Sequence, residues 1–212
     1  MERAAVVPIR RRTQAERSAT TCGRLLDATI DCLLDLGYAG TTTTEVSKRA
    51  GVSRGAQLHH YPTKAALVTA AVEHLYMQRH AEFVAAMKKL PAGPDRLLAS
   101  IDLLWTMVSG RTFYAWLELA VAARTDPELR ESVAAITRRF TETVDRTFAD
   151  LFGAEGALGP VSDVGPAFAF ALMEGLALHR IVLDDGRLPQ ILETFKNLAR
   201  LFLPPRAPKE RS

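Results

Sequence analysis

The sequence predicts an all-α fold of about nine helices. Apolar residues recur at spacings of three and four, and no run of β-branched residues alternates with polar ones as a half-buried strand would. Residues 41–64 add a more specific signal, because they form two short helical segments around a tight turn. These observations predict a three-helix N-terminal domain that contains a helix-turn-helix, followed by a larger helical C-terminal domain.

Composition limits the classes of protein to which the chain can belong. The hydrophobic share of 48% is ordinary for a globular protein. The most apolar run, residues 164–178, is interrupted by Glu174 and is too short to span a bilayer. Arg10, Arg11 and Arg12 are followed by no apolar segment. We therefore expect no signal peptide and a cytoplasmic protein without membrane contact.

The positive charge is concentrated at the N-terminal end. Residues 1–76 contain 10 Lys and Arg and 7 Asp and Glu, whereas residues 77–212 contain 17 of each. The net charge of +3 therefore belongs to the helix-turn-helix and to the segment before it. A DNA-binding protein needs positive charge only where it meets phosphates, so this distribution favours DNA as the partner of the N-terminal domain.

The first helix is expected over residues 13–36, because leucine and isoleucine recur on one face and Gly37 then provides a C-terminal stop. Cys22 and Cys32 lie on this helix, roughly 15 Å apart, which is too far for a disulfide. We expect both thiols to be buried and inert. The basic arm before the helix, residues 1–12, is expected to be disordered; it either strengthens DNA binding or is a solvated tail.

The helix-turn-helix has recognisable boundary residues. Thr42 and Glu45 have the spacing of a capping box, in which each side chain bonds the backbone N–H of the other residue. Gly51 is expected to adopt the positive φ of the turn, and Ser53 is a favourable N-cap for the second helix. That helix carries side chains suited to phosphate oxygens and base edges: Arg54, Gln57, His59 and His60.

Six more helices are expected after the helix-turn-helix. Pro91 and Pro94 separate the first of these helices from the second. The fourth starts at Asp126-Pro127-Glu128, which provides an N-cap, a proline at the first helical position and an acid in the first turn. The expected helices cover residues 64–90, 95–109, 111–124, 126–152, 163–183 and 188–203, with a Gly/Ala/Pro-rich loop at 153–160. The expected domains are residues 13–63 and 64–203, with a flexible tail at 204–212.

Several short motifs in residues 24–76 resemble one known family. They are Gly37 after a long helix, Thr41-Thr42, Ala50-Gly51-Val52-Ser53 and His59-His60-Tyr61-Pro62-Thr63-Lys64. Together they resemble the N-terminal domain of TetR-type transcriptional regulators. The resemblance implies a repressor rather than an activator, with a C-terminal domain that binds a small molecule and dimerises. One departure is Leu58, where the family usually has a tyrosine that contacts a phosphate.

The DNA-binding residues are expected around the helix-turn-helix. Arg54 lies near the start of the second helix, the end that meets base edges in this motif, and could pair with guanine. The resemblance places Lys64 and the threonines of the first short helix at the phosphate backbone; otherwise they are a solvated lysine and a capped loop. The expected partner is a pseudo-palindromic operator in double-stranded DNA, and the expected set is Thr42, Thr43, Thr44, Ser53, Arg54, Gly55, Gln57, His59, His60, Tyr61 and Lys64.

Large apolar side chains in the middle of the chain are candidates for an effector pocket. Both tryptophans lie there, in segments that surround the ligand in the resembled family. Aromatic walls favour a hydrophobic or aromatic effector, whose identity the sequence does not give. Aromatic residues at helical spacing are also common in plain core. The candidates are Trp105, Met107, Phe113, Trp116, Glu118, Phe140, Met173 and His179, with Arg111 as a further polar group.

The last two helices are expected to form a homodimer. Residues 167–178 are apolar on nearly every side, and one monomer can cover only one side of such a helix. A two-fold palindromic DNA site also requires a two-fold symmetric protein. Paired with its symmetry mate, the helix pair would form a four-helix bundle. The expected interface contains Phe168, Leu172, Leu176, Ile191, Phe195, Leu198 and Phe202.

Other functions have weaker support in the sequence. Residues 51–55 match G-x-S-x-G, the nucleophile elbow of α/β-hydrolases, but the residues before them are polar and helical rather than a buried strand. His74 and His80 are six apart, whereas paired metal ligands on a helix prefer three or four. We therefore predict no enzyme, no cofactor and no metal. A helix-turn-helix protein whose C-terminal domain only dimerises, without an effector, is the alternative to a ligand-responsive regulator.

Overall fold

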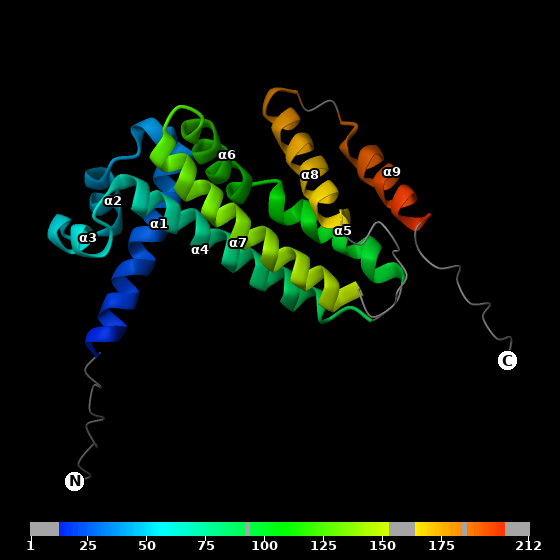
Figure 1. The fold of residues 1–212 in the computed structure, drawn as a ribbon, viewed down its shortest axis with the longest axis horizontal. Coiled ribbons are helices and arrows are strands. Elements are labelled where there is room, and N and C mark those ends of the chain that lie inside the picture. Colours follow the sequence, from blue (N-terminus) through cyan, green and yellow to red (C-terminus); the bar gives the residue numbers. More distant parts are fainter. Residues whose placement is uncertain (1–12, 92–93, 153–163, 184–185, 202–212) are drawn as a thin grey trace, which may run out of the picture. The chain divides into compact units, whose positions relative to one another are not determined.

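The computed structural model describes residues 13–91, 94–152, 164–183 and 186–201. Within these ranges the chain forms nine α-helices and no strand, which confirms the predicted all-α fold (Figure 1). The helices are α1 (Gln14–Gly40), α2 (Thr43–Ala50), α3 (Arg54–His60), α4 (Lys64–Met87), α5 (Pro94–Val108), α6 (Arg111–Ala123), α7 (Pro127–Phe152), α8 (Gly165–Val182) and α9 (Leu188–Arg200). The predicted arm at residues 1–12, the loop at 153–160, the tail at 204–212 and Phe202 lie outside the described residues.

The chain divides into two compact units, residues 1–71 and 72–212. The division falls within α4 and later than the expected boundary after residue 63. The first turns of α4 belong to the N-terminal unit because Leu67 is buried in the same apolar cluster as Leu25 of α1 and Val46 of α2. The boundary residues alone gave no sign of this packing.

The first helix has a capped start and an interrupted end. Thr13 and Glu16 form a reciprocal capping box, with hydrogen bonds of 3.2 and 2.8 Å between each side chain and the other residue's N–H. Gly37 leaves the helical conformation with φ 68° and ψ 176°, as expected of a stop, and the chain then makes one more turn to Gly40. The N–H and the hydroxyl of Thr41 both donate to the Gly37 carbonyl, at 3.1 and 2.8 Å.

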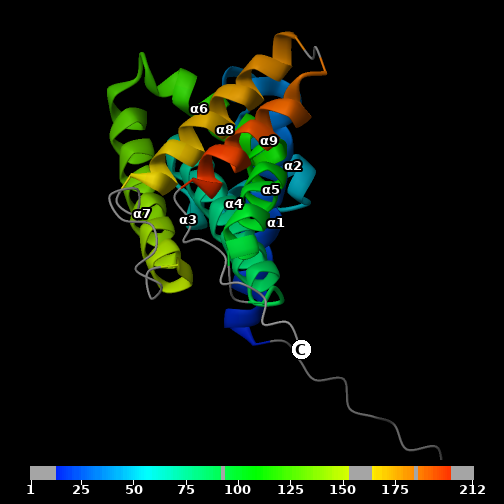
Figure 2. The same ribbon diagram turned by 90° about the vertical axis from the view of Figure 1, so that its right-hand side faces the viewer.

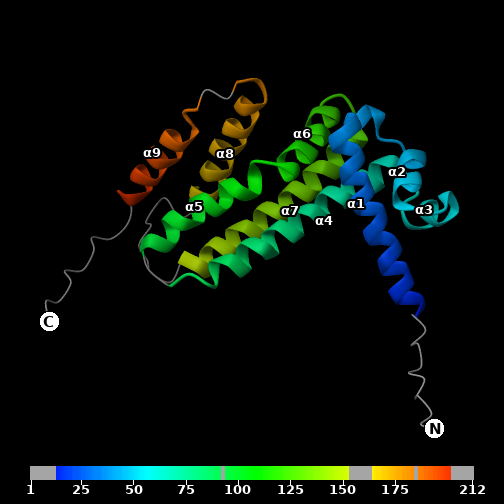
Figure 3. The ribbon, with the colours of Figure 1, turned by 180° about the vertical axis from the view of Figure 1, so that it is seen from behind.

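The helices of the C-terminal unit enclose two apolar clusters. In the first, α5 packs against α8 and α9 through Ile101, Met173 and Leu192 (Figure 2). In the second, Met87 of α4 and Phe152 of α7 pack with side chains of α5. Figure 3 shows α7 running alongside α4, and a polar contact between His80 and Thr147 of this pair is described below. No helix in the described ranges has both the length and the apolar character that a membrane span needs.

The later helix boundaries follow the local signals in the sequence. Asp126 caps α7 by accepting a hydrogen bond of 3.0 Å from the N–H of Leu129, and the helix runs to Phe152 as predicted. Thr63 caps α4 in the same way, accepting from the N–H of Ala66 at 3.0 Å. The ends of α4 and α9 come three residues earlier than expected.

Candidate nucleic-acid interface and effector cavities

The helix-turn-helix is formed by α2 and α3 around Gly51. Gly51 has φ 62° and ψ 36°, the left-handed conformation predicted for the turn. Thr42 caps α2 by accepting from the N–H of Glu45 at 3.1 Å, and Ser53 caps α3 by accepting from the N–H of Ala56 at 3.3 Å. The predicted turn, the predicted Ser53 cap and the threonine half of the predicted capping box at Thr42 are therefore confirmed.

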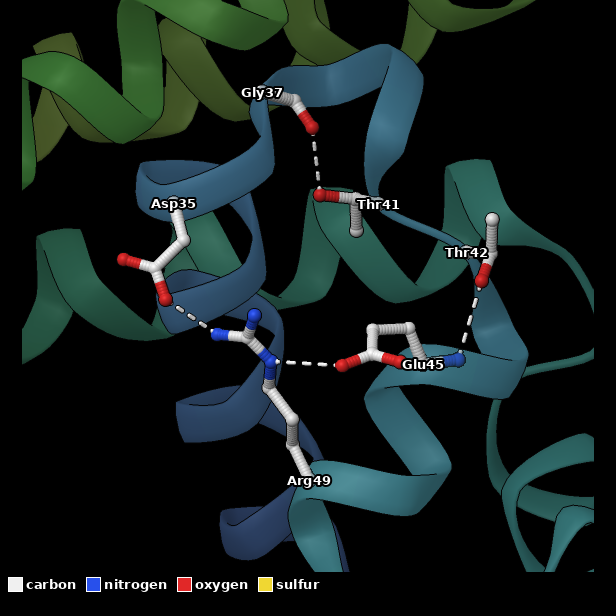
Figure 4. A network of polar contacts seen from close by, with 6 residues as sticks. All are labelled: Asp35, Gly37, Thr41, Thr42, Glu45 and Arg49. Atoms are coloured by element: carbon white, nitrogen blue, oxygen red, sulfur yellow. Dashed lines mark hydrogen bonds and ion pairs between the residues drawn. The ribbon is translucent and has the colours of Figure 1, made fainter.

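An ion-pair network fixes α2 on α1 (Figure 4). Arg49 donates to Asp35 of α1 at 2.6 Å and to Glu45 of its own helix at 3.2 Å. Glu45 had been predicted to reach back to the backbone of Thr42 as the second half of a capping box. Its carboxylate pairs with Arg49 instead, so the cap on α2 has only its threonine half. Hydrogen bonds to the two carboxylates stabilise the Arg49 cation and raise its pKa.

The exposed face of the motif carries polar side chains from both helices. Arg54 is exposed at the start of α3, and its Nη1 lies 3.4 Å from Thr44 Oγ1. Among these polar groups lies Leu58, whose side chain is 44% exposed. The exposed members of the predicted set are Thr42, Thr44, Ser53, Arg54, Gly55 and His59, and Thr43 is half-buried.

Gln57 does not belong to this exposed face. Its exposed fraction is 0%, and its Nε2 donates to the carbonyl of Tyr61 at 2.5 Å. The N–H of Tyr61 donates in return to the carbonyl of Gln57 at 2.8 Å. Gln57 therefore holds the C-terminal end of α3, and this geometry contradicts its predicted contact with base edges. Its Oε1 is buried without a hydrogen-bond partner.

Three other predicted DNA contacts point into the N-terminal unit. His60 is half-buried, with Nδ1 3.5 Å from the Sγ of Cys22. Tyr61 packs against the cluster around Leu25. Its burial, and to a lesser extent the nearby Cys22, raise the pKa of its hydroxyl group to about 12. Lys64 donates to the carbonyl of Tyr38 at 2.5 Å and lies 4.0 Å from the centre of its ring.

Two of the buried contacts bear on earlier expectations. Burial lowers the pKa of Lys64. Its ammonium group already contacts Tyr38, so a phosphate could bind it only alongside or in place of that contact. The expectation of two buried thiols holds for Cys32, whereas Cys22 is half-buried beside His60. A sequence pattern could not show this contact, because it joins α1 to α3.

Two of the cavities among the helices of the C-terminal unit have mainly apolar linings. The larger, of about 610 Å³, lies between α4, α5, α7, α8 and α9 and is walled by apolar side chains such as Phe83, Leu104 and Phe148. The smaller, of about 260 Å³, is lined by Tyr76 and Glu174 together with aromatic residues of α6, α7 and α8. Burial raises the pKa of the Glu174 carboxyl.

Half of the predicted effector residues line these cavities. Met107 and Phe140 line both, and Phe113 and Trp116 line the smaller one. The other four, Trp105, Glu118, Met173 and His179, line neither. Met173 is fully buried in the core that α8 shares with α5, Trp105 packs against that core, and His179 is exposed. The sequence also gave no reason to choose Tyr76, His80 or Glu174, because only the packing of distant helices brings them to the cavities.

The last two helices expose many large apolar side chains. Phe168 of α8 is 58% exposed and Leu198 of α9 is 50% exposed, and the rings of Phe168 and Phe195 lie 5.9 Å apart. Leu172, Leu176, Ile191 and Phe195 are half-buried. Further large apolar side chains are exposed on or beside the same two helices: Val164, Leu178, Ile181, Val182, Leu183 and Leu201.

An exposed helix-turn-helix in the positively charged N-terminal part of an all-α chain defines a DNA-binding protein of the helix-turn-helix class. Residues 25–71 match the family of bacterial regulatory proteins described as the tetR family, and residues 94–202 match the C-terminal part of BetI-type transcriptional repressors. The chain belongs to the TetR family, and it is a DNA-binding transcriptional regulator.

Individual relatives agree with this assignment. CymR of Pseudomonas putida, an HTH-type transcriptional regulator, is 41% identical over 192 residues, which cover 90% of this chain and 95% of CymR. An uncharacterised HTH-type regulator of Mycobacterium tuberculosis is 31% identical over 179 residues, covering 84% of this chain and 92% of its own. A solved TetR-family structure from a Rhodococcus species is similar in fold, with a TM-score of 0.70 and 20% sequence identity. The superposition covers 88% of this chain and 100% of the Rhodococcus chain.

Proposed function

We propose that this regulator is a homodimeric repressor that leaves its operator when a small apolar molecule binds in the C-terminal unit. The observation that carries the proposal is the apolar cavity of about 610 Å³ in the same chain as the helix-turn-helix. Its volume lies within the range of about 300–1,000 Å³ that is usual for small-molecule sites. An unfilled cavity forgoes packing contacts, so a unit that served only for dimerisation would gain nothing from it.

The proposed DNA contacts use the exposed face of α2 and α3. Arg54, at the start of α3, is placed to offer its guanidinium fork to the O6 and N7 of a guanine. The hydroxyls of Thr42, Thr44 and Ser53 are suited to phosphate oxygens, since they are exposed at the starts of the two helices. Gly55 and His59 are the remaining exposed candidates from the predicted set.

The proposed dimer uses α8 and α9. Exposed phenylalanine, leucine, isoleucine and valine side chains on these helices form the kind of apolar surface that marks a protein interface. Two copies related by a two-fold axis would cover this surface and present two recognition helices to a pseudo-palindromic site. Effector binding can release DNA only if the effector prefers the conformation of the dimer that binds the operator less tightly.

The proposal can be tested with purified protein. An operator is first selected from random duplex DNA, and apolar compounds are then titrated while tryptophan emission and operator binding are followed together. Trp116 lines the smaller cavity and Trp105 packs against the neighbouring core, so we expect an effector to change their emission and to release DNA over the same concentration range. Compounds that bind the protein without changing operator affinity would support the effector-free alternative.

The direction of regulation needs a second measurement. With the selected operator placed over a reporter promoter, we expect the protein to lower expression and the effector to restore it. A rise in expression on adding the protein would make it an activator.

A further inference from the structure

The larger cavity has very few polar groups, and their hydrogen bonds restrict what they can offer a ligand. Among the described residues that line it, the side chains with polar atoms capable of strong hydrogen bonds are His80, Ser100 and Thr147. The hydroxyl of Ser100 donates to the carbonyl of Leu97 at 2.6 Å, and the hydroxyl of Thr147 donates to the carbonyl of Thr143 at 2.8 Å. Each hydroxyl has one hydrogen, so both retain only acceptor capacity.

The contact between His80 and Thr147 indicates which nitrogen of the imidazole carries the hydrogen. His80 Nε2 lies 2.7 Å from Thr147 Oγ1. We assign the hydrogen of this contact to His80 Nε2, because the Thr147 hydroxyl donates its hydrogen to the carbonyl of Thr143. Burial lowers the pKa of His80, which keeps the ring neutral at neutral pH. A neutral imidazole with its hydrogen on Nε2 has an acceptor lone pair on Nδ1.

All three polar side chains of this cavity can therefore accept a hydrogen bond from a ligand, and none has a hydrogen left to donate. We propose that the larger cavity takes an apolar molecule that carries one acidic O–H group, a phenol or a carboxylic acid, with that group bonded to His80 Nδ1. A phenol would keep its proton and donate it in a hydrogen bond. A carboxylic acid is ionised in neutral solution, so it would bind with the uptake of one proton from water. That proton would be shared between the carboxyl group and Nδ1, or would lie on Nδ1 as an imidazolium paired with the carboxylate.

The apolar lining supports the rest of this ligand class. The other lining residues are apolar, apart from glycine, and His80 is the one ionisable side chain among the described residues around the cavity. A ligand with several polar groups would lose hydrogen bonds to water that this lining cannot replace. An ether or ester of the same shape would fill the same volume but would have no hydrogen for His80. The inference rests on the proposed effector role, because it names the chemistry of the effector.

Matched ligand pairs test the proposal. The binding of 4-pentylphenol is compared with that of 4-pentylanisole, and the binding of 4-pentylbenzoic acid with that of its methyl ester, by titration calorimetry on the full chain. We expect the phenol to bind roughly three to ten times more tightly than the anisole, the ratio that one net hydrogen bond gives. We expect the acid likewise to bind more tightly than the ester, and this pair shows whether carboxylic acids belong to the class.

Two variants locate the effect. His80→Leu should abolish the preference for the phenol while still binding the anisole, and that retained binding shows that the cavity is intact. His74→Leu is the matched control, because His74 is an exposed histidine on the same helix that does not line the cavity, and it should keep the preference.

The outcomes separate the ligand class from the effector role. Equal affinities of the wild type for the phenol and the anisole, no binding of either, or an unchanged preference in His80→Leu would overturn the inference. If the phenol binds with the expected preference but does not change operator affinity, the ligand site stands and the proposed effector role fails.

Discussion

At the scale of single residues, Arg54 and Gln57 show how much depends on one turn of a helix. They are three positions apart on α3, yet Arg54 is exposed and Gln57 is fully buried with its amide on the Tyr61 carbonyl. Both have side chains that can read base edges, so residue type alone could not separate them. Their surroundings give them different expected roles, with Arg54 at the DNA and Gln57 supporting the helix that carries it.

Truncation of the two residues to alanine should therefore have different effects on DNA binding. Arg54→Ala should relax specificity at one base position of each half-site, by about 1–3 kcal/mol of discrimination. Gln57→Ala should weaken binding to all sequences alike, because it loosens the end of α3 without removing a base contact. Competition binding against operators changed one base pair at a time measures both effects. A loss of preference at a single base position in Gln57→Ala would restore Gln57 as a base-reading residue.

Glu174 provides a prediction about pH. Burial raises the pKa of its carboxyl, so between the ordinary pKa and the raised one the folded state holds more protons than the unfolded state. Stability should then fall as pH rises through this interval, and above it the ionised carboxylate destabilises the fold. Glu174→Gln should stabilise the protein at neutral pH, and the gain should vanish as pH falls below the ordinary pKa of about 4.5. Urea unfolding at both pH values measures this; a gain that is the same at both would contradict it.

At the scale of elements, the helix-turn-helix contains two glycines whose backbone conformations differ. Gly51 has a positive φ, whereas Gly55 lies within α3 at an ordinary helical position. A Cβ at either residue would meet nothing within 4 Å, so steric contact does not distinguish them. The difference between the two sites is therefore conformational.

This pair forms a controlled experiment. Gly51→Ala should destabilise the free protein by about 1–2 kcal/mol, because an L-residue is strained in the left-handed conformation. Gly55→Ala should stabilise it by about 0.5–1 kcal/mol, because alanine loses less backbone entropy in a helix. Denaturant unfolding without DNA measures both; a stabilising Gly51→Ala would show that the turn can adopt another conformation.

The sequence predicted elements better than contacts, for a physical reason. The cap at Thr42, the turn at Gly51 and the start of α7 at Asp126 depend on neighbours within four residues, so a local pattern contains the information. Asp35, the partner of Arg49 on α1, is 14 residues away, and Thr147, the partner of His80, is 67 residues away. Such contacts depend on how helices pack. Helix packing also buries Gln57 and leaves half of the predicted effector residues outside the linings of the two cavities.

At the scale of the whole molecule, the apolar surface of α8 and α9 predicts a dimer that a single charge can dissociate. Leu198→Asp would place a carboxylate in the proposed interface, where burial without a partner is costly. Val121→Asp is the matched control, because Val121 is 58% exposed on α6 while Leu198 is 50% exposed on α9. By sedimentation at micromolar concentration, we expect a dimeric wild type, a dimeric Val121→Asp and a monomeric Leu198→Asp. A monomeric wild type would contradict the proposed assembly.

Phe168, Phe195 and Leu198 line the larger cavity and also lie on the proposed dimer surface. If the partner subunit covers them, it forms part of the boundary of the cavity, and association and ligand binding share one free-energy cycle. A ligand that binds the dimer more tightly would then tighten association by the same factor for each of the two cavities that it fills. The dose at which a cell responds to the effector would thus depend on how many copies of the regulator it holds.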